Sequence, residues 1–284
     1  MKSVPRPEIA ISPDVALRPW RLTPALRISI LFHAGCAILV ALVPVVWLWA
    51  LGGVLVNHLI LTAAVFWPSG RILGPNMTRL PEAAIRRNEI ALTFDDGPDP
   101  EITPKILDML DRYDARASFF CIADKVAAYP DLAREIVRRG HSLENHTMSH
   151  PHVFAMFGWR GLLREVSAAQ TTIHTLTGIA PEFFRAPMGF RSPFLAPVIE
   201  RIGLRYVTWT RRGYDVFASK PEPVMQRLQR GLAAGDILLL HDGRSHLSHG
   251  GPMVVLDVLP RLLEHLRARG LRSVSLRGGC DHAG

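Results

Sequence analysis

The chain contains no Lys, Arg, Asp or Glu between Arg27 and Arg71. The core of this gap, residues 28–66, is rich in Leu, Val, Ala and Trp. One membrane-spanning helix needs about 20 apolar residues, so the run is roughly twice that length. It is too long, and begins too far from Met1, for a cleaved signal peptide. The run therefore predicts a membrane anchor with a second, separate domain after it.

Two spans joined by a tight turn explain the turn and aromatic residues inside the run. Pro44 and the pair Gly52–Gly53 flank Trp47 and Trp49, near its middle. Tryptophan prefers the membrane–water interface, and arginines on both sides of the run keep both ends in the cytoplasm. We therefore favour a transmembrane helical hairpin in a bacterial-type inner membrane, with the following domain on the cytoplasmic side. One long span, which would export that domain, is the alternative.

The net charge of +8 suits an anionic lipid surface, so membrane lipids are expected partners. The chain has no lysine-rich run and no interleaving of aromatic and basic residues, so no nucleic-acid partner is expected. The three cysteines show no CxxC spacing, which argues against a disulfide framework or a cysteine zinc site.

From about residue 88 short apolar runs alternate with amphipathic segments. Strand-like runs cover residues 89–94, 117–122, 141–145, 182–185, 204–209, 236–240 and 271–276. Helical spacing covers residues 103–113, 131–139, 159–177, 193–202, 221–234 and 253–269. This alternation predicts an α/β domain with a parallel sheet, as a deformed (β/α) barrel. An open doubly wound sheet is the alternative.

The expected organisation has five parts. They are a basic tail (1–27), a transmembrane hairpin (28–67), a linker (68–87), the α/β domain (88–277) and a C-terminal tail (278–284).

Reactive side chains follow the predicted strands. Asp95 and Asp96 follow the first strand, His146 the third, Arg185 the fourth and His241 the sixth. The carboxyl ends of parallel barrel strands meet at one face, so we expect these side chains to lie together.

The spacing of His146 and His150 places both imidazoles on one side of a helical turn, which suits a divalent metal such as zinc. Two histidines and one carboxylate leave metal positions open for water, which is typical of a catalytic site. Of the paired Asp95 and Asp96, one can bind the metal while the other accepts a proton.

Five motifs in order then resemble those of the NodB-type polysaccharide deacetylases, which form carbohydrate esterase family 4. They are TFDDGP at 93–98, HTMSH at 146–150, RAPMG at 185–189, WTRRGYD at 209–215 and LLLH at 238–241. The resemblance covers residues 88–277. It implies a deformed barrel that removes an N-acyl group, usually acetyl, from an amino sugar.

The resemblance also implies residue roles. Asp95 is similar to the family's catalytic base, and Asp96, His146 and His150 to its metal ligands, which usually hold zinc. Three further residues resemble catalytic partners, namely Arg185 (which holds the base), His241 (the general acid) and Asp215 (which tunes the acid). The expected lining of the acyl pocket and groove is Pro187, Trp209 and Leu239.

The departures from the family pattern bear on the substrate. Ala186 and Met188 stand where an aromatic residue is common, and Val216 where a tryptophan is common. Arg211 and Arg212 stand where an acidic residue often occurs. An arginine here either contacts a substrate anion, a role we assign to Arg212, or forms a structural ion pair.

The expected activity is N-deacylation of an amino sugar in a membrane-associated or lipid-linked glycan. A deformylase or amidase acting on another amide would use the same residues. A glycan-binding pseudoenzyme is a third hypothesis, but it would predict the loss of a metal ligand or of the base, and Asp95, Asp96, His146 and His150 are all present.

Overall fold

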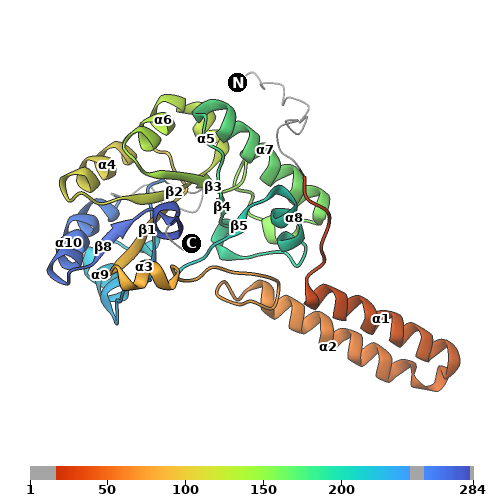
Figure 1. Ribbon diagram of the computed structural model, residues 1–284. Coiled ribbons are helices and arrows are strands. Elements are labelled where there is room, and N and C mark those ends of the chain that lie inside the picture. The colour runs from red at the N-terminus through yellow and green to blue at the C-terminus, as the bar shows by residue number, and fades with distance from the viewer. Residues whose placement is uncertain (1–16, 244–252, 282–284) are drawn as a thin grey trace.

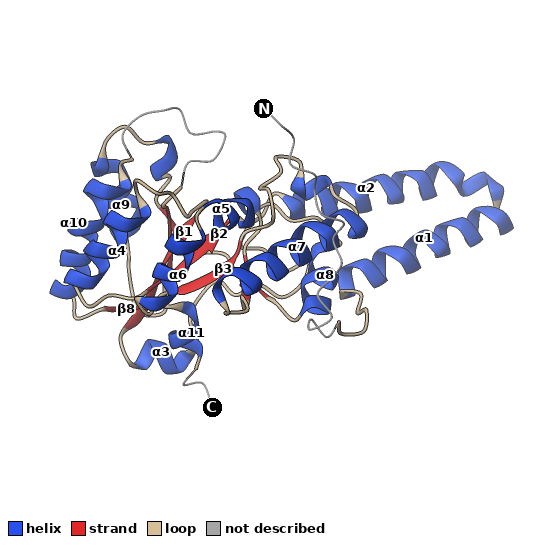
Figure 2. Cartoon of the chain, turned by 90° about the horizontal axis from the view of Figure 1, so that it is seen from above, coloured by secondary structure: helices blue, strands red, loops and turns tan. Residues whose placement is uncertain are grey.

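The computed structural model describes residues 17–243 and 253–281. The first sixteen residues of the expected basic tail and the last three of the expected C-terminal tail lie outside the described residues. The described chain forms a helical hairpin and a sheet domain, and the hairpin projects away from the sheet in two views (Figures 1 and 2).

The apolar run folds as two helices that lie side by side (Figure 1). They are α1 (Pro24–Leu42) and α2 (Trp47–Val65), joined by a 3₁₀ turn at Pro44–Val46. The Thr23 hydroxyl caps α1 by accepting a hydrogen bond from the Leu26 N–H. Both helical segments are long and apolar enough to cross a membrane, and most of their surface is exposed.

Polar residues inside the run pair between the two helices. Asn57 Nδ2 donates to Ser29 Oγ at 2.9 Å, and the Nε2 atoms of His33 and His58 lie 3.3 Å apart. These contacts join α1 to α2, and we assign them no chemistry.

The rest of the chain builds one eight-stranded parallel sheet. The strands are β1 (Glu89–Asp95), β2 (Ala117–Cys121), β3 (Ser142–Asn145), β4 (Phe183–Phe184), β5 (Arg205–Tyr206), β6 (Arg211–Arg212), β7 (Ile237–His241) and β8 (Arg272–Val274). Their order is β5-β4-β3-β2-β1-β7-β6, with β8 also paired to β1. Within the described residues β5 and β6 do not pair with each other, so the sheet curls into a half-barrel.

Helices surround the curled sheet (Figure 2), most of them on its outer face and two short ones, Glu82–Arg86 and Leu276–Cys280, against inward-facing residues at the start of the strands. They are α3 (Glu82–Arg86), α4 (Thr103–Arg112), α5 (Ala123–Ala128), α6 (Pro130–Arg138), α7 (Trp159–Thr177), α8 (Leu195–Ile202), α9 (Pro221–Gln229), α10 (Val255–Ala268) and α11 (Leu276–Cys280). The sequence predictions omit α3, α5, α11 and β6, because each is too short for a hydrophobic period to register.

The segment expected to be a linker contributes to the sheet. Met77 forms a parallel bridge with Val207, and Arg79 an antiparallel bridge with Asp236. The Arg79 guanidinium also pairs with the buried Asp236 carboxylate at 2.9 Å. This segment therefore contacts the residue after β5 and the residue before β7, on the two sides of the opening in the sheet.

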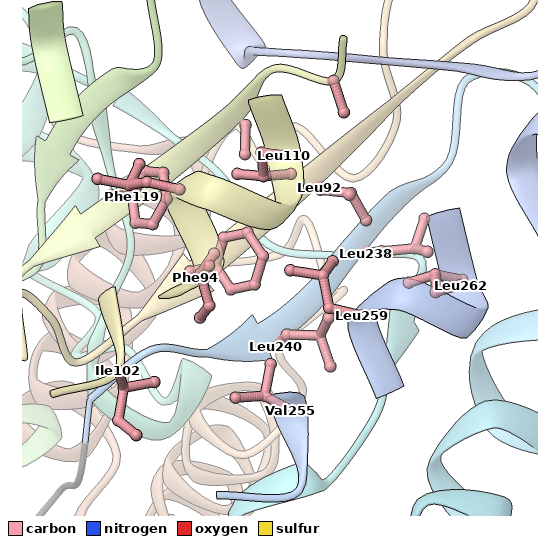
Figure 3. Close-up of a cluster of buried hydrophobic side chains, with 14 of the residues drawn as sticks. Leu92, Phe94, Ile102, Leu110, Phe119, Leu238, Leu240, Val255, Leu259 and Leu262 are labelled. Atoms are coloured by element: carbon pink, nitrogen blue, oxygen red, sulfur yellow. The ribbon is translucent and has the colours of Figure 1, made fainter. Parts of the chain in front are cut away.

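The main hydrophobic core lies between the outer face of the sheet and helices α4 and α10 (Figure 3). Leu92 and Phe94 from β1 meet Leu238 and Leu240 from β7, and the ring of Phe94 stacks on that of Phe119 at 5.1 Å. All seven residues of β1 are buried, as expected for a strand covered on both faces.

Candidate active site

Strand alternation decides which side chains reach the interior of the half-barrel. Leu92 and Phe94 enter the helix-facing core, so Thr93 and Asp95 point the other way. In β7 the same alternation turns Leu239 inward. His241 follows on that face, and the β1–β7 register pairs Asp95 directly with it.

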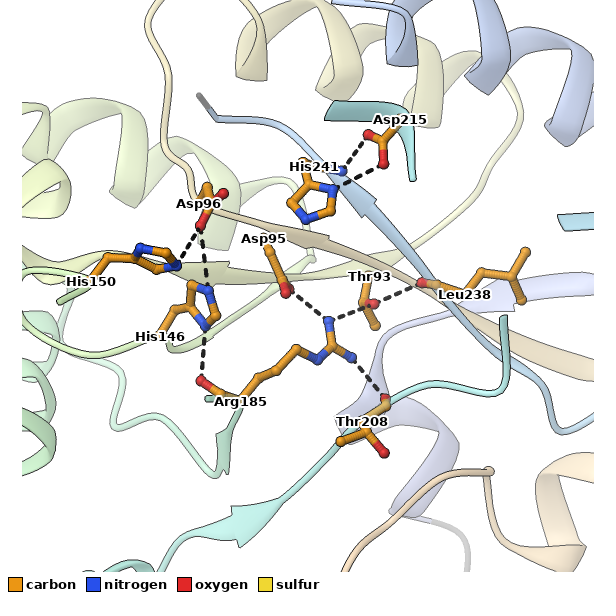
Figure 4. A network of polar contacts seen from close by, with 10 residues as sticks. All are labelled: Thr93, Asp95, Asp96, His146, His150, Arg185, Thr208, Asp215, Leu238 and His241. Carbon is orange, nitrogen blue, oxygen red and sulfur yellow. Dashed lines mark hydrogen bonds and ion pairs between the residues drawn. The ribbon is translucent and has the colours of Figure 1, made fainter. Parts of the chain in front are cut away.

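Asp96, His146 and His150 form a compact set of metal-ligating groups (Figure 4). Each offers one ligand atom, and these atoms lie within 4.8 Å of one another. His146 Nε2 and His150 Nε2 lie 3.4 and 3.3 Å from Asp96 Oδ1. All three residues of this set are buried.

The atoms that face the centre of this set carry lone pairs and no protons, so the centre can accept a cation. His146 Nδ1 lies 2.8 Å from the Arg185 carbonyl, which can only accept, so Nδ1 carries the proton and Nε2 keeps a lone pair. Burial lowers the pKa of His150 to about 4, so His150 is neutral near pH 7. Asp96 Oδ1 is buried without a hydrogen-bond donor. Lone pairs that converge in this way fit a divalent metal.

The two histidines reach this centre from a loop, so the predicted helical turn is wrong. Thr147 and His150 have φ angles of 72° and 52°, which a right-handed helix does not accommodate. Asn145 Oδ1, at the end of β3, accepts from the Thr147 N–H at 3.0 Å, and Thr147 Oγ1 accepts from the His150 N–H at 2.9 Å. These hydrogen bonds, and not helical spacing, aim the two rings.

Asp95 is held by a fully buried arginine. Arg185 donates from NH1 to Asp95 Oδ1 at 2.7 Å and to Thr93 Oγ1 at 2.8 Å, and from NH2 to the Thr208 carbonyl at 3.0 Å. Its guanidinium carbon lies 4.1 Å from the centre of the Phe120 ring. A buried charge needs such partners, and they fix the Asp95 carboxylate beside the metal-ligating set.

His241 pairs with Asp215 on the opposite side of the pocket. His241 Nδ1 lies 2.9 Å from Asp215 Oδ1, and its backbone N–H donates to Asp215 Oδ2 at 2.9 Å. Burial lowers the pKa of His241, but the charge of Asp215 and its hydrogen bond outweigh burial and raise that pKa to about 9. The imidazole is therefore protonated at neutral pH, as a proton donor must be.

One pocket joins these groups. Its lining is Asp95, Asp96, His146, His150, Met188, Gly189, Trp209, Arg212, Val216, Phe217, Leu239 and His241. Three of the four expected substrate-contacting residues, Trp209, Leu239 and Arg212, are among them. Pro187 is buried and does not line this pocket, whereas the next residue, Met188, does.

The two adjacent arginines take different positions. Arg211 Nε donates to the buried Asp236 carboxylate at 2.7 Å, which is the structural ion pair left open by the sequence. Arg212 lies over the rings of Trp209 and Tyr214, with centroid distances of 5.1 and 4.8 Å, and lines the pocket.

Two buried residues to which the sequence motifs assign no role support the site. Asp242 accepts a hydrogen bond from Thr103 Oγ1 at 2.6 Å, and burial raises its pKa to about 7. Asn76 Oδ1 accepts from Thr208 Oγ1 at 3.0 Å, and the backbone carbonyl of the same threonine accepts from Arg185. Asp242 directly follows His241 at the end of the sixth predicted strand, where reactive side chains are expected, whereas nothing around Asn76 in the sequence marks it.

Three groups meet at the carboxyl edge of the curled parallel sheet: a His-His-Asp set, an Asp–Arg pair and an Asp–His pair. This arrangement is typical of a hydrolase with a candidate metal site. Known proteins identify the family. A family model described as polysaccharide deacetylase matches residues 83–207.

Curated relatives extend this match. A chitooligosaccharide deacetylase of Azorhizobium caulinodans is 33% identical over 197 residues, which cover 66% of this chain and 93% of the relative. A peptidoglycan-N-acetylglucosamine deacetylase of Bacillus cereus is 31% identical over 189 residues, which cover 66% of this chain and 85% of the relative. A solved peptidoglycan N-acetylglucosamine deacetylase superposes with a TM-score of 0.65 at 26% identity, over 72% of this chain and 92% of that structure.

The chain belongs to the polysaccharide deacetylase family. It is an enzyme of that class, a glycan N-deacetylase, which confirms the resemblance drawn from its five motifs.

Proposed function

We propose that this enzyme removes the acetyl group from an N-acetylated amino sugar in a membrane-associated or lipid-linked glycan, with zinc held by Asp96, His146 and His150. The observation that carries the proposal is the pocket in which this set, the Asp95–Arg185 pair and the His241–Asp215 pair converge. Amide hydrolysis needs a nucleophile, a base and an acid, and the pocket offers a group for each.

The roles of the side chains follow from their partners. When bound, the cation supplies a Lewis acid that lowers the pKa of water and polarises the acyl carbonyl. Asp95, oriented by Arg185, accepts the proton of the attacking water. His241 is protonated and donates its Nε2 proton to the departing sugar nitrogen, because Asp215 occupies its Nδ1.

An amino sugar is the substrate class that the relatives support, since two of them are named for chitooligosaccharide and for peptidoglycan N-acetylglucosamine. Trp209 and Leu239 line the pocket and provide an apolar wall for the acyl methyl group. The departures at Met188 and Val216 also line it, so the groove is shaped differently from the common family pattern.

The position of the hairpin supports a membrane-bound substrate. Phe66, at the end of α2, packs edge-on against Phe190 at 5.0 Å, one residue from the pocket-lining Gly189. Arg191 NH2 donates to the Gly70 carbonyl, just beyond the hairpin. If α1 and α2 span the inner membrane, these contacts hold the pocket near the lipid surface, and both chain ends lie in the cytoplasm.

The test measures acetate and formate released by the full-length protein in detergent, with N-acetylated chitooligosaccharides and with N-acetylated and N-formylated sugars linked to a polyprenyl lipid. We expect acetate release that a chelator abolishes and zinc restores. Formate release alone would instead assign a deformylase. Binding of the glycan without release of either acid would assign a glycan-binding protein.

Two variants separate the roles within the set. Asp95→Asn should lower turnover by about 10²–10⁴-fold, the usual contribution of general base catalysis, and should keep its zinc. His146→Ala should lose zinc, which metal analysis of the purified protein measures. Zinc loss in Asp95→Asn, or activity of metal-free His146→Ala, would contradict the assignment.

A further inference from the structure

A second cleft lies beside the active-site pocket. It has a volume of about 290 Å³ and is lined by Tyr214, Phe217, Ala218, Ser219, Lys220, Pro223 and Arg227. Phe217 lines both hollows, so the cleft and the pocket are neighbours on either side of its side chain. If the acyl group of a sugar lies in the pocket, the group linked to that sugar can reach this cleft.

Arg212, Arg227 and Lys220 place positive charge at the cleft and its border, and Glu222 lies near enough to Lys220 to interact with its charge without forming an ion pair. Arg212, at the border, has a buried Nε atom without a hydrogen-bond partner. Arg227 lies over the Tyr214 ring at 5.6 Å and, within the described residues, donates to the Gly213 carbonyl at 3.4 Å. Among residues 17–243 and 253–281, no carboxylate forms an ion pair with Arg212, Arg227 or Lys220. Acidic side chains are absent from the described lining of the cleft.

The neighbouring acids are already paired elsewhere. Asp215 binds His241, and Glu222 pairs with Arg261 at 3.0 Å. Arg211, next to Arg212, is neutralised by Asp236 at 2.7 Å. A neutral glycan would cover these cations without supplying a counter-charge, and that desolvation is costly. A phosphate matches them, because a guanidinium stacked on an aromatic ring still presents its N–H edge for two parallel hydrogen bonds.

We propose that Arg212, Arg227 and Lys220 form a phosphate subsite, so that the substrate is an amino sugar carrying a phosphate or pyrophosphate beside the sugar that is deacetylated. This inference rests on the proposed function for the reaction itself and adds the chemical class of the substrate. A soluble sugar phosphate and a polyprenyl pyrophosphate-linked sugar share this chemistry.

The test compares kcat/KM for acetate release from one N-acetylated sugar in three forms: uncharged, phosphorylated, and linked through pyrophosphate to a polyprenyl lipid. The wild-type protein should prefer the phosphorylated forms, and Arg227→Gln should lower the ratio of charged to uncharged kcat/KM by about tenfold or more, as loss of a charge-assisted pair does. Arg160→Gln is the matched control, because Arg160 also stacks on an aromatic ring, that of Trp159 at 5.1 Å, and lies outside the cleft.

An unchanged ratio in Arg227→Gln, or an equal change in Arg160→Gln, would overturn the subsite. A preference for the lipid-linked over the soluble phosphate would support the subsite and identify the lipid as the source of the phosphate. If no form releases acetate, the proposed function fails, and the subsite is tested separately by calorimetric titration with inorganic pyrophosphate. Binding that Arg227→Gln weakens supports the subsite, and binding that Arg227→Gln leaves unchanged refutes it.

Discussion

The Asp215–His241 pair determines the pH range in which the pocket can donate a proton. Burial alone would lower the pKa of His241 and make it neutral near pH 7, where it could not act as an acid. The carboxylate of Asp215, 2.9 Å from Nδ1, reverses this effect. It also fixes the ring so that only Nε2 is left for the substrate.

Asp215→Asn should move the alkaline limb of the kcat–pH profile to lower pH. A general acid works only while it is protonated, so the rate falls as the pH rises through its pKa, which is about 9 in the wild type. Removing the charge that raises this pKa lowers it, and above the new limb the rate falls by about tenfold per pH unit. Acetate release measured across the pH range checks the shift.

Zinc in the pocket would lower the pKa of His241 in both proteins, so the difference between the two profiles is the quantity to compare. The zinc content of Asp215→Asn should equal that of the wild type, because Asp215 does not belong to the ligating set. An alkaline limb that stays in place would show that another group donates the proton.

Residues in short motifs could be predicted from the sequence, together with the motif partners Arg185 and Asp215, whereas Asn76, which lies outside every motif, could not. Asp95, Asp96, His146 and His150 each lie beside a strand end, where chemistry is expected. Asn76 contacts the site only through Thr208, more than a hundred positions away in the sequence. Contacts of this kind depend on tertiary packing, which leaves no local pattern.

At the scale of elements, the turns that follow β1 and β7 press against each other behind the metal-ligating set. A Cβ atom on Gly243 would lie 2.0 Å from the Asp96 carbonyl oxygen and 2.8 Å from the Gly97 nitrogen. Both neighbours are backbone atoms, which cannot rotate away as a side chain can. The two turns can therefore meet only because residue 243 is a glycine. The same contact sets the backbone position of Asp96.

Gly243→Ala should therefore force the two turns apart and displace Asp96. We expect zinc binding and acetate release to fall sharply, with a loss in stability of about 1–3 kcal/mol from overpacking. Metal content, turnover and the thermal unfolding midpoint measure the three effects.

Gly178→Ala is the matched control for this substitution. Gly178 ends α7 with a φ of 76° and has open space around it. An alanine there costs roughly 1–2 kcal/mol of backbone strain but leaves the site intact. Equal losses of zinc in both variants would mean that Gly243 acts on stability alone.

The long elements were predictable because their hydrophobic period is sustained, as in α7 and in the buried β1. The loop at residues 146–150 was predicted with the wrong local geometry. Its i, i+4 spacing fits a helical turn. Hydrogen bonds accepted by the Asn145 and Thr147 side chains hold it instead as a non-helical loop. Spacing alone cannot distinguish the two, because both bring the imidazoles together.

At the scale of the whole molecule, the hairpin and the site share buried contacts. Asn76 Nδ2 donates to the Pro68 and Gly70 carbonyls at 2.8 and 3.1 Å, and its Oδ1 accepts from Thr208. A continuous set of hydrogen bonds therefore joins the end of the hairpin to the arginine that holds Asp95. If the hairpin spans a membrane, as we propose, the side on which it ends decides which glycans the pocket can reach.

Alkaline phosphatase fused to the C-terminus of the full chain should be inactive, and a green fluorescent protein at the same position should fluoresce. Two spans return the chain to the cytoplasm, and the basic residues on both sides of the run, such as Arg27 and Arg71, favour that arrangement. Alkaline phosphatase needs an oxidising compartment for its disulfides, so its activity reports the outer side. The control is a fusion of alkaline phosphatase directly after Val43, the end of the first span, which should be active. An active full-length fusion would make α1 and α2 a single crossing, turn the site towards exported glycans, and exclude cytoplasmic lipid-linked precursors as its substrates.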